Sequence, residues 1–342
     1  MGIKGTENAV DTGATKLVEV WRGPILESMH FGHAAIVDAS GQLVRAWGDP
    51  ETIILPRSSC KMLQALPLME SGAADAAGLS DRQLALACAS HNGAAIHSEA
   101  VTAWLSDMGM SESDLRCGSQ EPADIPARDA MIRAGETPCQ IHNNCSGKHT
   151  GFLTLNRHIG GGTEYVEADH PVQKAVRAAF EETTGMDSPG YAIDGCSAPN
   201  FATSVTGLAR AMAFFANAHK GSSVRDKAAA RLTAAMATFP EMVAGETRAC
   251  TELMRAMDHK VAIKTGAEAV FVAIIPELGL GVALKVIDGG TRGAECAIAA
   301  ILCELGVLDP EHPATRQRMN VPLLNRRGLD TGIIRPAPGF PT

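Results

Sequence analysis

The stretch of sequence that decides both fold and chemistry is Arg57-Ser58-Ser59-Cys60-Lys61. It follows a strand-like end at Leu55-Pro56 and opens a helical pattern that continues to Leu66. A hydroxyl at a helix start gains from the positive end of the helix dipole, and a lysine three residues further on lies on the same face. We therefore interpret Ser58 as a candidate nucleophile and Lys61 as its base, which requires the lysine amine to be neutral part of the time.

A Ser-x-x-Lys pattern alone is weak, because it is equally typical of an N-capping serine followed by a surface lysine. Two further segments strengthen it. Ser90-His91-Asn92 emerges from the apolar run 84–89, and Lys264-Thr265-Gly266 ends a strand-like run whose glycine would let substrate approach the strand edge. In this order the three elements are typical of serine β-lactamases and penicillin-binding proteins, in which a Ser-Lys pair performs acyl transfer.

Two cysteine-containing segments form a further candidate site: residues 143–149, which include Cys145, Lys148 and His149, and residues 194–197, which include Asp194 and Cys196. Two thiolates are good zinc ligands, and Cys145 and Lys148 share one face of a helix start, although an amine ligand must be deprotonated. The pattern indicates a zinc site. The alternatives are a polar pocket wall with two unligated thiols, or a Cys145–His149 catalytic pair that lacks a third, orienting group.

Strand-like segments occupy both ends of the chain. They cover residues 16–21, 34–38 and 42–47, and then 261–264, 269–275 and 281–287, followed by a helix over 294–305. Between them, residues 58–257 are dominated by helical periodicity, for example over 172–182, 201–216 and 224–237. If the terminal strands share one sheet, the fold is α/β with a mostly antiparallel sheet from the chain termini and a helical middle. No domain boundary is visible, so residues 1–342 are expected to form a single domain, with 1–13 as a flexible extension.

Composition excludes several classes of function. The formal charge of −8 and the absence of a basic run argue against nucleic acid as a partner. No stretch of the sequence reaches membrane-spanning length, and the polar first residues do not make a signal peptide, so we expect a cytoplasmic protein. The nine cysteines lack the density of a secreted disulfide scaffold and are expected to be mostly reduced thiols.

Taken together, these segments resemble the Rhizobium etli-type L-asparaginases, the class 3 or asparaginase II family. The resemblance is densest at the motifs quoted above and at Asp169-His170-Pro171-Val172-Gln173, and it runs from Val18 to Gly290. It implies a serine β-lactamase-like fold, a homodimer, and hydrolysis of L-asparagine to L-aspartate and ammonia.

The resemblance also implies roles for particular residues. Ser58 with Lys61 and Ser90 with Lys264 would form two Ser-Lys tandems, while Cys145, Lys148 and Cys196 would bind a Zn²⁺ ion that aids substrate binding without activating the nucleophile. The candidate substrate-binding residues are Arg57, His149, Asp194, Thr265 and Gly266.

Two other functions remain open from the sequence. The same Ser58 would serve an esterase or lactamase, and the cysteine cluster would serve a zinc-dependent asparagine- or amide-binding protein without catalysis.

Overall fold

The structure, a computed structural model, describes residues 12–342, so most of the expected N-terminal extension lies outside the described residues. The described residues form an eight-stranded sheet in the order β11-β12-β1-β2-β10-β9-β8, with β3 paired to β2. Its strands come from the two ends of the chain: β1 (Thr15–Arg22), β2 (Ile25–Val37), β3 (Leu43–Trp47), β8 (Ala262–Gly266), β9 (Val270–Ile275), β10 (Leu280–Val286), β11 (Val321–Leu324) and β12 (Asp330–Pro336). Each pairing is antiparallel. The predicted α/β class, with a sheet built from both termini, is therefore confirmed.

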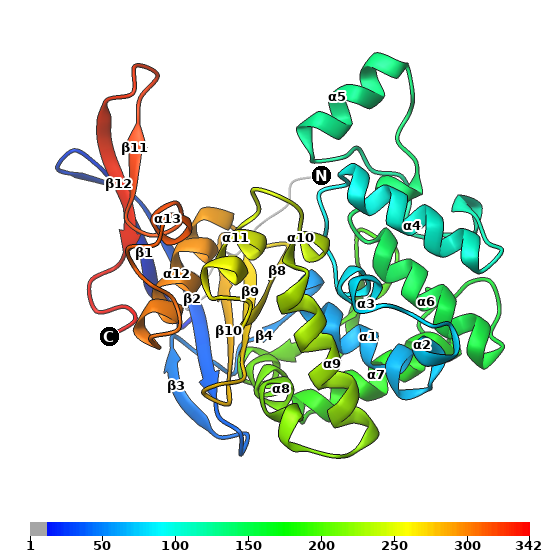
Figure 1. Cartoon of the computed structure of the whole chain (residues 1–342). Coiled ribbons are helices and arrows are strands. Elements are labelled where there is room, and N and C mark those ends of the chain that lie inside the picture. Colours follow the sequence, from blue (N-terminus) through cyan, green and yellow to red (C-terminus); the bar gives the residue numbers. More distant parts are fainter. Residues whose placement is uncertain (1–11) are drawn as a thin grey trace, which may run out of the picture.

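The helical middle gathers beside this sheet, on the right in Figure 1. Its helices are α1 (Lys61–Glu70), α2 (Ala73–Ala76), α3 (Asp81–Ala87), α4 (Ala95–Asp107), α5 (Ile125–Ala134), α6 (Ser146–Ile159), α7 (Pro171–Thr184), α8 (Val205–Asn217), α9 (Val224–Thr238), α10 (Pro240–Val243) and α11 (Ala249–Ala256). The 3-10 helices are η1 (Arg57–Cys60), η2 (Glu112–Asp114), η3 (Gln140–His142) and η4 (Ala218–Lys220). After the last central strand come α12 (Thr291–Glu304) and α13 (Pro313–Arg316). None of the helices within residues 12–342 combines the length and the apolar character needed to cross a membrane.

Two pairings join strands from the two ends of the chain, namely β1 with β12 and β2 with β10. In the second pairing, Val37 lies opposite Gly281 and Gly32 opposite Val286. Strand β9 is buried along its whole length, and β10 is buried over 281–284, because α8 and α12 both pack against these strands. The sheet therefore holds β8, which carries Lys264, in a fixed place between the other strands and the helices.

The helix predicted over 201–216 is present, but its start differs from the prediction. Helix α8 begins at Val205, four residues later than predicted, because Ser204 caps it by accepting a hydrogen bond from Gly207 N at 3.0 Å. The residues before it pair as short strands: β4 (Ile53–Ile54) with β7 (Thr203–Ser204), and β5 (Tyr191–Ile193) with β6 (Pro199–Phe201).

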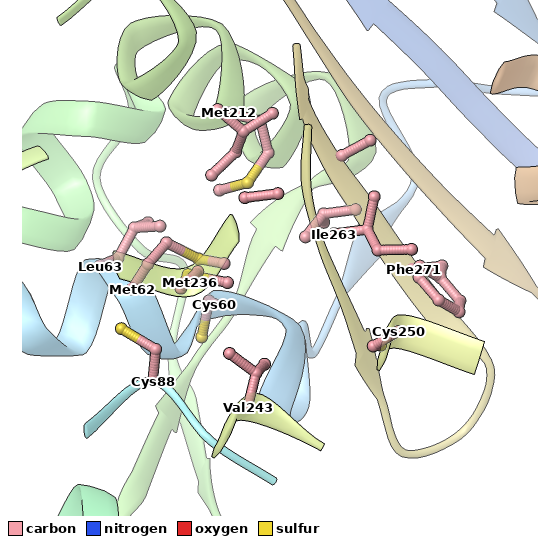
Figure 2. Close-up of a cluster of buried hydrophobic side chains, with 14 of the residues drawn as sticks. Cys60, Met62, Leu63, Cys88, Met212, Met236, Val243, Cys250, Ile263 and Phe271 are labelled. Carbon is pink, nitrogen blue, oxygen red and sulfur yellow. The ribbon is translucent and has the colours of Figure 1, made fainter. Parts of the chain in front are cut away.

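Buried hydrophobic side chains pack together around the start of α1. Figure 2 shows side chains from the start of α1 meeting side chains from α8, α9 and strands β8 and β9. The labelled members are Cys60, Met62, Leu63, Cys88, Met212, Met236, Val243, Cys250, Ile263 and Phe271. Because protein interiors are close-packed, this cluster fixes the first turn of α1 against the strand that carries Lys264.

Candidate active site

The Ser58 segment folds as a tight turn that runs straight into α1. Ser59 N and Ser59 Oγ both donate to the carbonyl of Pro56, at 3.2 and 2.7 Å, and the Cys60 thiol donates to the carbonyl of Arg57 at 3.2 Å. Arg57 adopts a φ of 53°, which is strained for a residue with a side chain. Such strain persists where surrounding contacts over-determine the backbone, and it often occurs at functional sites.

Gly266, at the end of β8, explains how the turn and the strand come together. A Cβ at this position would lie 2.6 Å from Pro56 O and 2.9 Å from Ser59 N, so only glycine fits. We expected the glycine to give substrate access to the strand edge; the backbone of the Ser58 turn itself occupies the space that the missing side chain leaves.

Lys61 is 1% exposed and points into the protein. Its Nζ donates to the carbonyl of Ala89, and it also donates to Cys145 Sγ at 3.1 Å. One amine therefore links the first turn of α1 to the segment that leads to Ser90 and to the residue that immediately precedes α6.

Lys264 is the second buried lysine, also 1% exposed, and its Nζ donates to the carbonyl of Thr265 at 2.8 Å. Burial, and then the charge of Lys61, lower the pKa of Lys264 to about 7. Burial disfavours the charged form because little water solvates it, and a neighbouring cation adds repulsion. Lys264 can therefore gain or lose a proton near neutral pH.

Ser58 and Ser90 line one cavity of about 320 Å³. The Ser90 hydroxyl is buried and has no hydrogen-bond partner, and within residues 12–342 no hydrogen bond joins Ser58 or Ser90 to either lysine. The two hydroxyls are therefore free to turn toward a molecule in the cavity.

The other residues that line this cavity are Asn144, Arg248, Ala249, Cys250, Thr265, Gly266, Ala267, Thr291 and Glu295. Two of the predicted substrate-binding residues, Thr265 and Gly266, are among them. Arg248, Cys250 and Glu295 were missed, because they lie at the start of α11 and on α12 and belong to no short motif that sequence alone would single out.

Arg57 and Asp194 lie outside this wall and contact each other. Arg57 Nε and Nη2 donate to Asp194 Oδ1 at 2.9 and 2.7 Å, and both side chains are partly buried. The ion pair connects the residue before Ser58 to the loop that carries Cys196, so in this structure it fastens two parts of the site together.

The cysteine-containing segments do meet, as expected from the sequence. Lys148 Nζ donates to Cys196 Sγ at 3.0 Å, and Cys145 donates to Asn144 Oδ1 at 2.9 Å. The neighbouring Cys145 thiol, and then the Lys148 ammonium, hold the pKa of Cys196 well below its usual value despite burial. Burial acts to lower the pKa of Lys148, but the Cys196 and Cys145 thiols raise it overall. A thiolate–ammonium pair is thus the favoured charge state.

This cluster has the donor types of a zinc site, with two thiols and one amine. Within the described part of the chain, no three or more side chains of the His, Cys, Asp and Glu types lie close enough together to hold a metal. A zinc site built from these residues therefore needs Lys148 as its third ligand.

His149 is fully buried beside this cluster, with Nδ1 2.9 Å from Tyr165 Oη and Nε2 without a hydrogen-bond partner. Burial, and then the charge of Lys148, lower the pKa of His149 to about 4. Its imidazole is neutral at neutral pH, so it offers hydrogen bonding rather than a positive charge.

Known proteins similar to this chain are distant in structure. They include a putative β-lactamase from Bacteroides dorei DSM 17855, at 10% identity and a TM-score of 0.41, with 75% of this chain and 85% of that chain covered. A second is Mglu in its tris and glutamate form, at 12% identity and a TM-score of 0.46, with 82% and 60% covered. A third is an octameric penicillin-binding protein homologue from Pyrococcus abyssi, at 13% identity and a TM-score of 0.37, with 87% and 80% covered. TM-scores this low support no conclusion about the chemistry of this chain.

No curated protein matches the sequence. The family described as L-asparaginase II, in contrast, matches residues 18–336, which include each motif discussed above. The resemblance inferred from those motifs is confirmed, and the chain belongs to the L-asparaginase II family of amidohydrolases.

Proposed function

We propose that this chain hydrolyses the side-chain amide of L-asparagine through an acyl-enzyme on Ser58. The observation that carries the proposal is the cavity that Ser58 and Ser90 both line, with the buried amines of Lys61 and Lys264 on the segments that form its wall. Hydroxyls activated by a neutral amine are the nucleophiles of Ser-Lys acyl transfer.

In the first half of the reaction, Ser58 Oγ attacks the amide carbon and its proton passes to the amine of Lys61, which this step requires to be neutral. Backbone N–H groups at Ser58 and on the strand after Lys264 hold the oxyanion, and each such donor is worth about 3 kcal/mol. The C–N bond then breaks, the leaving nitrogen takes the proton from Lys61, and ammonia departs.

In the second half, water attacks the ester and gives its proton, through the Ser90 hydroxyl, to neutral Lys264. The ester bond breaks, Lys264 returns the proton to Ser58 Oγ, and aspartate leaves. The lowered pKa of Lys264 supports this role, because a base works best when its pKa lies near the operating pH.

The zinc site is part of the same proposal. Cys145, Lys148 and Cys196 would hold the ion, which when bound supplies a positive centre that aids substrate binding. The bond between Lys61 and Cys145 supports a connection between this site and the nucleophile segment.

A second copy of the chain is the proposed partner, as the family resemblance implies. The exposed apolar side chains of Ile25, Met29 and Phe31 along β2 support an interface there, because soluble surfaces seldom leave such side chains together in water.

The central test is ammonia release from L-asparagine by purified protein. Ser58→Ala and Lys61→Met should each lower kcat by at least about a thousandfold, since removing a nucleophile or its base removes the covalent route. The exposed residues Ser106 and Lys260 provide matched controls, and Ser106→Ala and Lys260→Met should each have the kcat of the wild type. Turnover that survives in the Ser58 or Lys61 variant would exclude the Ser-Lys assignment. Faster turnover of an ester or lactam than of asparagine would favour the esterase or lactamase alternative.

The pH dependence tests the role of Lys264. Its amine is protonated below its pKa and neutral above it, so kcat/KM should rise with pH through about 7 and then level off. Lys264→Arg, which stays protonated, should be inactive over the same range. The range that matters is about one pH unit either side of 7. A wild-type kcat/KM that stays constant across this range would contradict the proposal.

Elemental analysis tests the metal. The purified protein should contain zinc, and Cys145→Ala and Cys196→Ala should each lose it, because a site with three protein ligands binds weakly when one is removed. Cys303→Ala, at a partly buried thiol on α12 outside the cluster, should keep its zinc. Wild-type protein that is free of zinc and still binds asparagine fully would exclude the site. Asparagine binding without ammonia release would favour a zinc-dependent binding protein.

A further inference from the structure

Two side chains of opposite charge in the cavity wall have no part in the chemistry proposed above. Arg248 lies immediately before α11, and Glu295 lies in the second turn of α12. Both line the cavity that also contains Ser58 and Ser90.

Arg248 is half-buried and its guanidinium has no hydrogen bond or ion pair with any side chain or carbonyl in residues 12–342. The contrast with Arg255 on the same helix is clear, since Arg255 donates to Glu246 at 2.7 and 2.8 Å. A guanidinium offers five donors in a planar fork, and leaving them without partners in a partly buried wall is unfavourable. Arg248 therefore has its full bonding capacity available to a molecule in the cavity.

Glu295 likewise has few interactions within the described chain. Its only ion-pair partner in the described chain is Arg318, with Nε 3.3 Å from Oε2, and its carboxylate accepts no hydrogen bond there. Arg318 bonds more closely to Glu252, at 2.7 Å. Burial raises the pKa of Glu295, although the charges of Arg318 and Arg248 act to lower it. An ammonium group in the cavity would stabilise this carboxylate as an anion.

A cation and an anion without hydrogen-bond partners, in one wall of a small cavity, match the two charges on the α-carbon of a free amino acid. Guanidinium binds carboxylate through two parallel bonds, and a carboxylate accepts strong bonds from an ammonium. The volume of about 320 Å³ is at the small end of ligand pockets, which suits an amino-acid amide.

We propose that Arg248 binds the α-carboxylate and Glu295 the α-ammonium of the substrate, which restricts this enzyme to amides that carry a free α-amino acid end. The proposal rests on the proposed function, because Ser58 defines the end of the cavity where the amide reacts. It places the recognition of charge on residues other than Arg57 and Asp194, which bond to each other outside this wall.

The test measures binding by calorimetry in a Ser58→Ala background, where ligands bind without turnover, in buffer that contains zinc. Three ligands separate the two charges: L-asparagine, succinamic acid, which lacks the α-amine, and 3-aminopropanamide, which lacks the α-carboxylate. Each truncated ligand should bind about tenfold to a hundredfold more weakly than asparagine, as expected for losing a hydrogen-bonded charge.

Variants then assign each loss to a residue. Arg248→Gln should weaken asparagine by about the same factor and leave 3-aminopropanamide within about twofold, since that ligand has no carboxylate to lose. Glu295→Gln should weaken asparagine and leave succinamic acid within about twofold, because that ligand has no ammonium. Arg255→Gln, on α11, and Glu304→Gln, on α12, are the matched controls, and both should bind all three ligands as the parent does.

Each result separates this proposal from the proposed function. If the variants weaken all three ligands equally, or if Ser58→Ala protein does not discriminate among the three ligands, the subsite is overturned even where ammonia release persists. If the ligand pattern holds and wild-type protein releases no ammonia, the subsite stands and the hydrolase assignment falls. The ligand series in Ser58→Ala protein needs neither Arg248→Gln nor Glu295→Gln, so equal binding of all three ligands would overturn the subsite even if both variants fail to fold.

Discussion

The structure depends on one buried amine, that of Lys61. Its partners are the carbonyl of Ala89 and the thiol of Cys145, and among residues 12–342 no carboxylate forms an ion pair with it. A lysine in the interior without an opposite charge is unfavourable, and single domains tolerate it mainly where function requires it. The same amine joins three segments, namely the nucleophile turn, the segment that leads to Ser90, and the start of α6. The contacts that bury Lys61 therefore also hold the reactive groups in position.

In this arrangement the cysteine cluster lies next to the nucleophile segment. Cys145 contacts Lys61 at 3.1 Å, and the Arg57–Asp194 ion pair joins the same two regions on the other side. A change in the charge of Cys145 would reach Lys61 directly, because electrostatic interactions weaken little over such a distance inside a protein. The second lysine, Lys264, is held by the sheet, and its pKa near 7 reflects burial together with the charge of Lys61.

Sequence predicted the parts of this site that lie in short motifs. Ser58-x-x-Lys61, Ser90 and Lys264-Thr265-Gly266 were found because periodicity and spacing place them at element ends, and the structure brings Ser58 and Ser90 to one cavity. The central strands were predicted from runs of apolar residues. Strands β11 and β12 and the first half of β2 were missed because their sequences do not alternate regularly between apolar and polar residues. Arg248 and Glu295 were beyond sequence analysis, since their significance comes from what they lack in the folded chain, namely hydrogen-bond partners.

The most direct test of a Ser58 acyl-enzyme is rapid quenching of the reaction with L-asparagine in acid, followed by mass spectrometry of the intact chain and of its peptides. An acyl-enzyme on Ser58 would give a transient mass increase of one aspartyl group, located on the peptide that contains Ser58 and absent from Ser58→Ala protein. An aspartyl group on Cys145 or on Ser90, or turnover through the quench times with no covalent adduct on any peptide under conditions that stabilise the ester, would contradict it.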